Sequence, residues 1–587
     1  MCGIVGFNWC DKSLVCQMME SIKNRGPDAE GFYVKDNISF GHQRLSIIDL
    51  SENGNQPLTN EDGSIIIIFN GEIYNFNELK HKLQKKHKFK SNTDSEVIVH
   101  AYEEYGEDCV KLFNGMFAFA IYDKNKEILF LARDRLGVKP LFYYFLNGKF
   151  IFASEIKAIK KSSVQLTIDD TAIYDYFTYR YVPTPKTIFN EIKKLDAATY
   201  IVFDLKEKHL KEQKYWSLNV SESTYDEKEV LNTLESLIKD CINIRLISDV
   251  PIGLFLSAGL DSSTIFHFLK DNTEINLLHV ATNTNEVKLV RRLSYNKAHI
   301  LEVDSTKEFD EIFKYFDEPF ADSSAIPTNL ISNAANDNNI KVILTGDGGD
   351  ELFAGYRHYS QFFTVKKIQK ILPKQFKKRL RSLSFKVRIS VLSKGFFVLS
   401  SNDDLEIYTK LLGGFTRDEK KMIFSKPFLE KLENYDDYWY FRKYWNDQVP
   451  LIKNLQILDI NTFLKDDILV KVDRMSMKNS VEVRSPFLDY RLFEFILSTK
   501  TGIFFKNDTL KYILKLMMRD RLPDYILNMK KKGFGYPIKK VDAQNHPSNL
   551  IIDKEYIIRN KKNAFIIGLN CDDYAQKNKK NNLGSKK

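Results

Sequence analysis

The sequence is poor in cysteine, and its few cysteines follow no regular spacing. Six occur among 587 residues, without a Cys-x-x-Cys pair. Neither a disulfide framework nor a zinc cage built from cysteines is therefore indicated. The chain also lacks an apolar run of about 18 residues and a signal peptide ahead of Cys2. We expect a protein of the reducing cytoplasm that does not span a membrane.

A strong excess of one charge is missing as well. The chain has 87 Lys and Arg against 77 Asp and Glu, a net charge of +10 that is small for this length. Much of the excess lies in residues 366–388 and at the C-terminus, so a nucleic-acid-binding surface is not indicated. Residues 366–388 predict a solvated pair of amphipathic helices, with contact to a membrane surface or to an acidic partner as the alternative.

The length and the pattern of apolar residues predict two domains and a tail. Residues 1 to about 200 consist mainly of short apolar and aromatic segments between turns, which indicates stacked sheets. From about residue 225, strands alternate with helices, as in a parallel sheet covered by helices, and the region from about 360 is mainly helical. We place the domains at 2–205 and 225–545, and a tail with a disordered end at 546–587.

Cys2 directly follows the initiator methionine, where a nucleophile can use its own α-amine as the base. Removal of Met1, which the small side chain of Cys2 permits, would leave an amine of near-neutral pKa beside the sulfur. An ordinary cysteine is the alternative, and the dipeptide alone would favour it. The stretches that follow decide between the two interpretations.

Four later residues would complete a site that hydrolyses an amide. Arg44 is a cation within an apolar run, and a guanidinium can hold a carboxylate through two hydrogen bonds. Asn70 can donate its side-chain amide to an oxyanion, and Gly71 lets a backbone N–H approach the same point. Asp94 can hold an ammonium group. A thiol, an oxyanion hole and clamps for a carboxylate and an amine together predict a glutamine amidase.

These stretches resemble the class II glutamine amidotransferases, which are N-terminal nucleophile hydrolases. The resemblance covers residues 2–200 and is carried by Cys2-Gly3-Ile4-Val5-Gly6, Arg25-Gly26-Pro27-Asp28, Arg44-Leu45-Ser46-Ile47, Asn70-Gly71-Glu72 and Asp94. It implies an α+β sandwich of the αββα type, with Cys2 as the nucleophile and Asn70 and Gly71 as the oxyanion hole. It also implies a glutamine pocket lined by Arg44, Leu45, Ile47, Asn70, Gly71, Glu72 and Asp94.

A second group of polar residues, SAGLDSS at 257–263, follows an apolar strand and precedes a helix. It is not a Walker A loop, but small residues at a helix N-terminus expose backbone N–H groups that suit a pyrophosphate. Asp261 within it would repel phosphate unless Mg²⁺ lay between them, so the aspartate predicts the metal. The alternative is that these serines and the aspartate only cap the helix.

The stretch TGDGGDELFAGY at 345–356 repeats this strand–turn–helix pattern, and Asp350 within it is a second candidate ligand of Mg²⁺. Together with 464–489 and 530–537, these stretches resemble the synthetase domain of the glutamine-hydrolysing asparagine synthetases. The resemblance covers about 225–540. It implies an α/β parallel-sheet domain of the adenine-nucleotide α-hydrolase type with a helical C-terminal part.

In that family ATP adenylates the side-chain carboxylate of aspartate with release of pyrophosphate, and ammonia then displaces AMP. The resemblance implies that pyrophosphate is held by Ser257, Gly259, Asp261, Ser262 and Ser263, and Mg²⁺ by Asp261 and Asp350. It further implies adenine-nucleotide contacts at Phe255 and Ala281, and an acyl-adenylate site at Thr345, Gly346 and Asp347. A lysine among 530–532, which we take to be Lys531, would neutralise phosphate charge.

The acceptor of the ammonia stays open, because residues 278–303 are shorter than in typical members and lack a glycine found there. Aspartate is the expected acceptor, and a uronic acid of a surface polysaccharide is the alternative. A non-catalytic protein that recruits acidic partners through 366–388 is an alternative from another class. We also predict an apolar channel from Cys2 to Asp347, because ammonia released into water would be protonated. A homodimer is the expected assembly.

Overall fold

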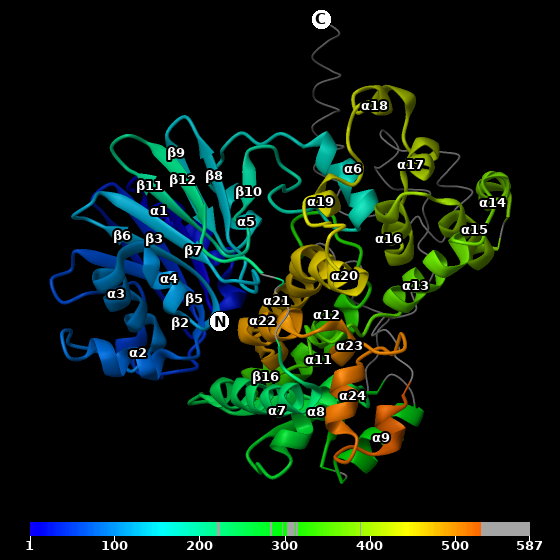
Figure 1. The fold of residues 1–587 in the computed structure, drawn as a ribbon. Helices are drawn as coiled ribbons and strands as arrows, with labels where there is room; N and C mark the ends of the chain where they lie inside the picture. Colours follow the sequence, from blue (N-terminus) through cyan, green and yellow to red (C-terminus); the bar gives the residue numbers. More distant parts are fainter. Residues whose placement is uncertain are drawn as a thin grey trace, which may run out of the picture.

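The computed structural model describes residues 1–218, 220, 224–281, 284–295, 297–301, 312, 315–387 and 389–529. An N-terminal part, residues 1–216, and a C-terminal part, residues 224–529, lie side by side, and the N-terminus lies at their junction (Figure 1). The predicted phosphate ligand Lys531 and the tail 546–587 lie outside the described residues. Within the described ranges, no helix combines the length and apolar character that crossing a membrane requires.

The N-terminal part contains two six-stranded sheets that pack face to face. The first has the order β10 (Ile192–Lys194), β8 (Phe142–Leu146), β9 (Lys149–Ala153), β1 (Gly3–Phe7), β3 (Ile38–Arg44) and β2 (Ala29–Lys35). The second has the order β12 (His209–Lys214), β11 (Thr199–Asp204), β7 (Ile128–Arg133), β6 (Gly115–Asp123), β5 (Ile65–Ile73) and β4 (Leu58–Thr59). One apolar cluster, which includes Ile4 and Phe40 from the first sheet and Ile68 and Leu131 from the second, fills the space between them.

Helices cover the outer face of each sheet. On the first sheet, α1 (Lys12–Glu20) and α5 (Ile156–Lys160) bury an apolar cluster. On the second, α2 (Phe76–Leu83), α3 (Asp94–Tyr105) and α4 (Cys109–Leu112) do the same. The predicted αββα sandwich is therefore confirmed. Strand β5 is buried along its whole length because helices cover one of its faces and the opposite sheet covers the other.

The C-terminal part is built on a five-stranded parallel sheet, which confirms the predicted α/β class. Its order is β15 (His299–Leu301), β14 (Asn276–Val280), β13 (Ile252–Phe255), β16 (Val342–Leu344) and β17 (Glu482–Arg484). Because all pairs are parallel, the carboxyl ends of the strands meet at one edge, where open α/β sheets bind their ligands. Helices around the sheet include α7 (Glu227–Asn243), α8 (Leu260–Leu269), α9 (Thr284–Leu293), α11 (Ala325–Asp337) and α12 (Gly349–Leu352).

The remainder is helical, as predicted, and extends away from the sheet (Figure 1). It comprises α13 (Arg357–Gln369), α14 (Lys374–Lys386), α15 (Ser390–Ser400), α16 (Asp404–Leu412), α17 (Arg417–Ile423), α18 (Lys426–Glu430), α19 (Trp439–Arg442), α20 (Leu451–Asp459), the π-helix Ile460–Ile468, α21 (Leu469–Lys478), α22 (Tyr490–Ser498), α23 (Thr501–Phe504), α24 (Tyr512–Met518) and α25 (Asp524–Leu527). Residues 366–387 of the basic stretch fall largely on α13 and α14, and most of α14 is exposed, so the predicted helix pair is present.

The two parts share a buried seam that contains both apolar and charged side chains. Leu45 and Met116 of the N-terminal part belong to the same apolar cluster as the core of the C-terminal part. At the seam, the buried Arg25 guanidinium donates to Glu155 at 2.9 Å and to Asp473 of α21 at 2.8 Å. Arg25 Nε also donates to the carbonyl oxygen of Cys2 at 3.1 Å.

A second buried arginine crosses the same seam from the opposite side. Arg484 of β17 pairs with Glu72 of β5 at 3.0 Å, and its Nε donates to Glu482 at 2.6 Å. Separating buried, oppositely charged groups costs several kcal/mol because each is left without a partner. These pairs therefore fix the position of β17 relative to β5. The two arginines therefore hold the start of β1 against α21 and the end of β5 against β17.

Replacement of Arg25 by alanine tests this seam. The change leaves the Asp473 carboxylate buried without its arginine partner, whereas Glu155 keeps Arg474 and Lys157. We therefore expect a loss of about 3–5 kcal/mol in the free energy of unfolding. Lys23→Ala is the matched control, because Lys23 pairs with Glu20 at an exposed site and should cost about 1 kcal/mol or less. Urea unfolding followed by tryptophan fluorescence gives both values, and equal losses in the two variants would contradict the assignment.

Candidate active sites

Cys2 lies at the start of β1 and at the seam between the two parts. Its side chain is buried, and the nearby backbone N–H of Leu45 favours the ionised form of the thiol. Burial raises the pKa of the thiol, although the nearby N-terminal ammonium and the Leu45 amide act in the opposite direction. Because Met1 is present, the Cys2 nitrogen is an amide, and it donates to Asn70 Oδ1 at 2.9 Å. The thiol thus lies beside the predicted oxyanion donors.

Asn70 and Gly71 lie next to each other in β5, with the properties that an oxyanion hole requires. Asn70 Nδ2 is buried, and among the described residues it has no hydrogen-bond partner. This donor is therefore available to a substrate oxygen. At Gly71, a Cβ would lie 2.1 Å from the carbonyl oxygen of Met116, so only glycine fits against β6. The structure places both predicted donors beside Cys2.

The Arg44 guanidinium, predicted to clamp a carboxylate, has several protein partners. Its Nη1 donates to the carbonyl oxygen of Ser51 at 2.9 Å and to Asn55 Oδ1 at 2.8 Å, and its Nη2 contacts the carbonyl oxygens of Ile48 and Asp49. Arg44 therefore organises the loop that follows β3. Sequence reasoning did not foresee this role.

The predicted amine clamp, Asp94, begins α3 and accepts a hydrogen bond from the backbone N–H of Ile73 at 2.7 Å. Burial raises the pKa of its carboxyl to about 6, and Glu482 acts in the same direction. Burial likewise raises the pKa of Glu72, even though Arg484 opposes the shift. Two carboxyl groups in the candidate glutamine pocket are thus poised to take up protons.

Sequence reasoning missed Glu482, which meets the N-terminus across the seam. The Met1 ammonium pairs with Glu482 Oε2 at 2.7 Å, and both groups are almost fully buried. Burial opposes ionisation of this carboxyl, but the ammonium and Arg484 together lower its pKa to about 2. The N-terminal amine therefore faces the C-terminal part. The only signal for Glu482 in the sequence was its place in the stretch 464–489, to which no chemical role was assigned.

The predicted pyrophosphate loop is the turn between β13 and α8. Ser257 Oγ and Ser262 Oγ lie 2.8 Å apart, and the Gly259 N–H donates to Ser257 Oγ at 3.1 Å. Gly259 is the N-cap of α8, and no side chain caps the helix there. The alternative that these residues only cap a helix is therefore wrong. Ser263 Oγ is buried and unpartnered within the described residues, which leaves it available to a ligand.

The two predicted Mg²⁺ ligands come together, and a lysine that the sequence did not reveal joins them. Lys511 Nζ lies 2.8 Å from Asp350 Oδ1 and also pairs with Asp261 Oδ2. Asp261 Oδ1 is buried with no hydrogen-bond partner in the described part of the chain. Paired carboxylates with an unsatisfied oxygen fit the oxygen ligands that Mg²⁺ prefers. No local pattern marks Lys511, which meets Asp261 only in the folded chain.

The other predicted nucleotide residues follow the carboxyl ends of neighbouring strands. Phe255 ends β13, Ala281 follows β14, and Thr345 follows β16. Thr345 Oγ1 donates to Asp347 Oδ2 at 2.7 Å. A Cβ on Gly346 would lie 2.9 Å from the Cβ of Asp261, so the two predicted loops are in close contact. The structure thus gathers these residues at one sheet edge.

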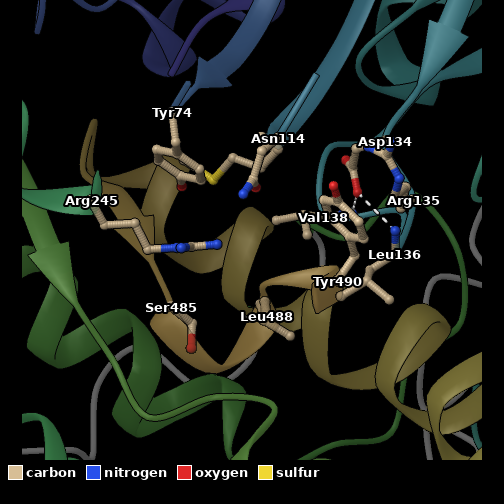
Figure 2. A pocket seen from close by; sticks show the side chains of 12 residues that line it. Tyr74, Asn114, Asp134, Arg135, Leu136, Val138, Arg245, Ser485, Leu488 and Tyr490 are labelled. Atoms are coloured by element: carbon tan, nitrogen blue, oxygen red, sulfur yellow. Dashed lines mark hydrogen bonds between the residues drawn. The ribbon is translucent and has the colours of Figure 1, made fainter. Parts of the chain in front are cut away.

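Two cavities lie at the seam. Figure 2 shows the first, which is lined by Tyr74 and Asn114 from the N-terminal part and by Arg245, Ser485 and Leu488 from the C-terminal part. The second is lined by Met1, Val138, Lys139, Asp347, Leu469, Val472, Asp473, Val483, Ser485 and Leu488. Its lining therefore includes both the residue before Cys2 and Asp347.

The geometry is that of a thiol hydrolase joined to a nucleotide-binding sheet. The family model for the glutamine amidotransferase domain matches residues 1–216, and the model for asparagine synthase matches 233–557. These matches define the class as a glutamine amidotransferase fused to a synthetase.

Curated relatives match over nearly the whole chain. Glutamine-hydrolysing asparagine synthetase 1 of Bacillus subtilis is 32% identical over 612 residues, with 99% of this chain and 95% of the relative covered. A provisionally named glutamine-hydrolysing asparagine synthetase 2 of Methanocaldococcus jannaschii is 36% identical over 521 residues, with 81% and 98% covered. The chain belongs to the family of glutamine-hydrolysing asparagine synthetases.

The raised pKa of Asp94 generates a test of the glutamine pocket. If Asp94 holds the substrate ammonium, its protonation as the pH falls through about 6 removes the charge that binds glutamine. We expect kcat/KM for glutamine to fall about tenfold per pH unit below that value. Asp94→Asn should lower kcat/KM for glutamine and remove its decline below about pH 6. Ammonia-dependent turnover, measured at a constant concentration of unprotonated ammonia, serves as the control, and the same decline there would contradict the assignment.

Proposed function

We propose that the protein makes asparagine from aspartate, with glutamine as the nitrogen donor and ATP as the activating substrate. Membership of the asparagine synthetase family implies the use of ATP. The observation that carries the proposal is the seam itself, where one cavity is lined both by Met1, the residue before Cys2, and by Asp347. Two chemically different sites that come this close to one cavity suit the production and the immediate use of ammonia.

In the first half-reaction, Cys2 attacks the side-chain amide of glutamine. After removal of Met1, its own α-amine takes the thiol proton and passes it to the departing ammonia. Asn70 Nδ2 and the Gly71 N–H stabilise the oxyanion, a contribution of about 10²–10³ in rate for one such donor. Glu72 and Asp94 line the pocket with Arg44, and water releases glutamate from the thioester.

In the second half-reaction, the aspartate carboxylate attacks the α-phosphorus of ATP and pyrophosphate leaves. The Ser257–Ser263 turn holds the pyrophosphate at the N-terminus of α8, as the unpartnered Ser263 hydroxyl supports. Asp261 and Asp350 would hold Mg²⁺, which neutralises phosphate charge. Lys511 pairs with both carboxylates and adds positive charge, as we also propose for Lys531, which lies outside the described residues. The acyl-adenylate then meets ammonia near Thr345 and Asp347.

Several sequence-based expectations accompany this proposal. The domain limits 2–205 and 225–545, a cytoplasmic location and a homodimer are kept as parts of it. A uronic acid as acceptor is the competing substrate, and no observation at the seam favours it over aspartate. Purified protein supplied with glutamine, Mg·ATP and a panel of carboxylic acids separates the two, because aspartate should yield asparagine and AMP. Amidation of a uronic acid in place of aspartate would overturn the proposed acceptor.

Replacement of Cys2 by alanine should separate glutamine-dependent synthesis from ammonia-dependent synthesis. We expect glutamine-dependent synthesis to fall to the background level, because no thiol attacks the amide. Synthesis from added ammonia should continue, since the second site is intact. Cys16→Ala, at an exposed cysteine, is the matched control and should leave both activities unchanged. Loss of both activities in folded Cys2→Ala protein would contradict the division of labour.

A further inference from the structure

A group of four potential metal ligands lies on the N-terminal part, away from both sites described above. His100 lies in α3, Glu103 lies one turn further along the helix, His87 lies in the loop before α3, and Glu61 lies in the loop before β5. One ligand atom from each lies within 4.8 Å of all the others. We propose that these four side chains bind a divalent transition-metal ion of the Zn²⁺ class.

The distances among the ligand atoms suit one small ion. Glu103 Oε2 lies 2.9 Å from His100 Nδ1 and 3.5 Å from His87 Nδ1. Glu61 oxygens lie 3.7 Å from His87 Nδ1 and 3.8 Å from His100 Nδ1. Tetrahedral Zn²⁺ with ligands at about 2.0–2.1 Å sets neighbouring ligand atoms about 3.3 Å apart. The four atoms are therefore close enough to reach one ion, and the His87 and His100 rings, which stack with centroids 4.5 Å apart, must turn so that both Nδ1 atoms point at it.

Second partners already orient most of these ligands. His87 Nε2 lies 3.2 Å from Glu104 Oε1, and a hydrogen bond there would leave Nδ1 as the free ligand atom. His100 Nε2 lies 3.7 Å from Glu96 Oε1, which is beyond hydrogen-bond distance, so among the described residues only the His87 imidazole has the carboxylate–histidine–metal arrangement.

The two glutamates are anchored in the same way. Glu103 Oε1 accepts a hydrogen bond from Asn60 Nδ2 at 2.7 Å, which turns its other oxygen toward the histidines. Glu61 Oε1 accepts one from the backbone N–H of Lys88 at 2.8 Å. Two imidazoles with two carboxylates, all nitrogen and oxygen donors, form a set that Zn²⁺ accepts. The His100 side chain is 1% exposed and that of Glu61 36%, so the site is buried on one side and open to solvent on the other.

A bound ion would brace the loop between α2 and α3. That loop carries His87 and leads directly into Asp94 at the start of α3, so the metal would order a segment beside the candidate glutamine pocket.

A proton shared with His100 could compensate the same carboxylates without any metal. Direct measurement of binding must therefore decide between the two.

The test is a Zn²⁺ titration of full-length protein that has been freed of metal with a chelator. Cys2→Ala protein is used so that the catalytic thiol does not bind the probe. We expect one ion per chain and a raised melting temperature. His87→Ala should weaken binding at least tenfold, and Glu104→Gln by about 10–100-fold. His81→Ala, at an exposed histidine of α2 outside the cluster, is the control and should bind as the parent does.

Co²⁺ gives a second, spectroscopic readout of the same site. A tetrahedral nitrogen–oxygen site should show visible d–d absorption without the near-ultraviolet band of thiolate ligation. His87→Ala should abolish this absorption while circular dichroism stays unchanged. Absence of binding, a thiolate band, or equal binding by His87→Ala and the parent protein would each overturn the proposal. Because none of these readouts uses catalysis, their failure would leave the proposed asparagine synthesis untouched.

Discussion

Two buried arginines, one from each part of the chain, hold the molecule together at the place where its chemistry is concentrated. Arg25 joins the carbonyl oxygen of Cys2 to Asp473, and Arg484 joins Glu72 to Glu482. Buried ion pairs add little net stability, but breaking one is costly because an uncompensated charge remains. Their main effect is therefore positional. They prevent the sandwich and the parallel sheet from sliding past one another.

This constraint explains why two sites made on separate folds can act as one enzyme. The sandwich presents Cys2 at the end of a strand, and the parallel sheet presents Asp347 just after another. Neither fold dictates where the other lies. The seam does so, and it leaves a cavity whose lining includes both Met1 and Asp347. We propose that this cavity is part of an internal route for ammonia.

Much of this could be predicted from sequence, because the decisive signals are local. The Asn70-Gly71 pair within a buried strand, and the serine-rich turn after β13, each carry their chemistry within a few residues. Local signals also sufficed for the sandwich, the parallel sheet and the basic helix pair. They indicated which strand ends would hold ligands, since parallel strands share an edge.

Contacts between distant segments were beyond such reasoning. Lys511 lies far along the chain from Asp261, and nothing in its neighbourhood distinguishes it from the many other lysines. The pairing of Arg484 with Glu72 depends on how the two domains dock. The spacing of apolar residues along the sequence predicts helices and strands but not this docking. For Arg44, the residue type alone suggested one role and missed another. Its residue type indicated a carboxylate clamp, whereas its Nη groups also hold the backbone of its own loop.

The central claim is that nitrogen passes from Cys2 to the activated acyl group inside the protein. The most direct measurement supplies unlabelled glutamine together with ¹⁵N-ammonium in the buffer and determines the isotope in the amide of the product. The seam predicts that, during glutamine turnover at saturation, the product nitrogen comes from glutamine and carries almost no label. Label in proportion to the ammonia of the bulk solution would contradict an internal route.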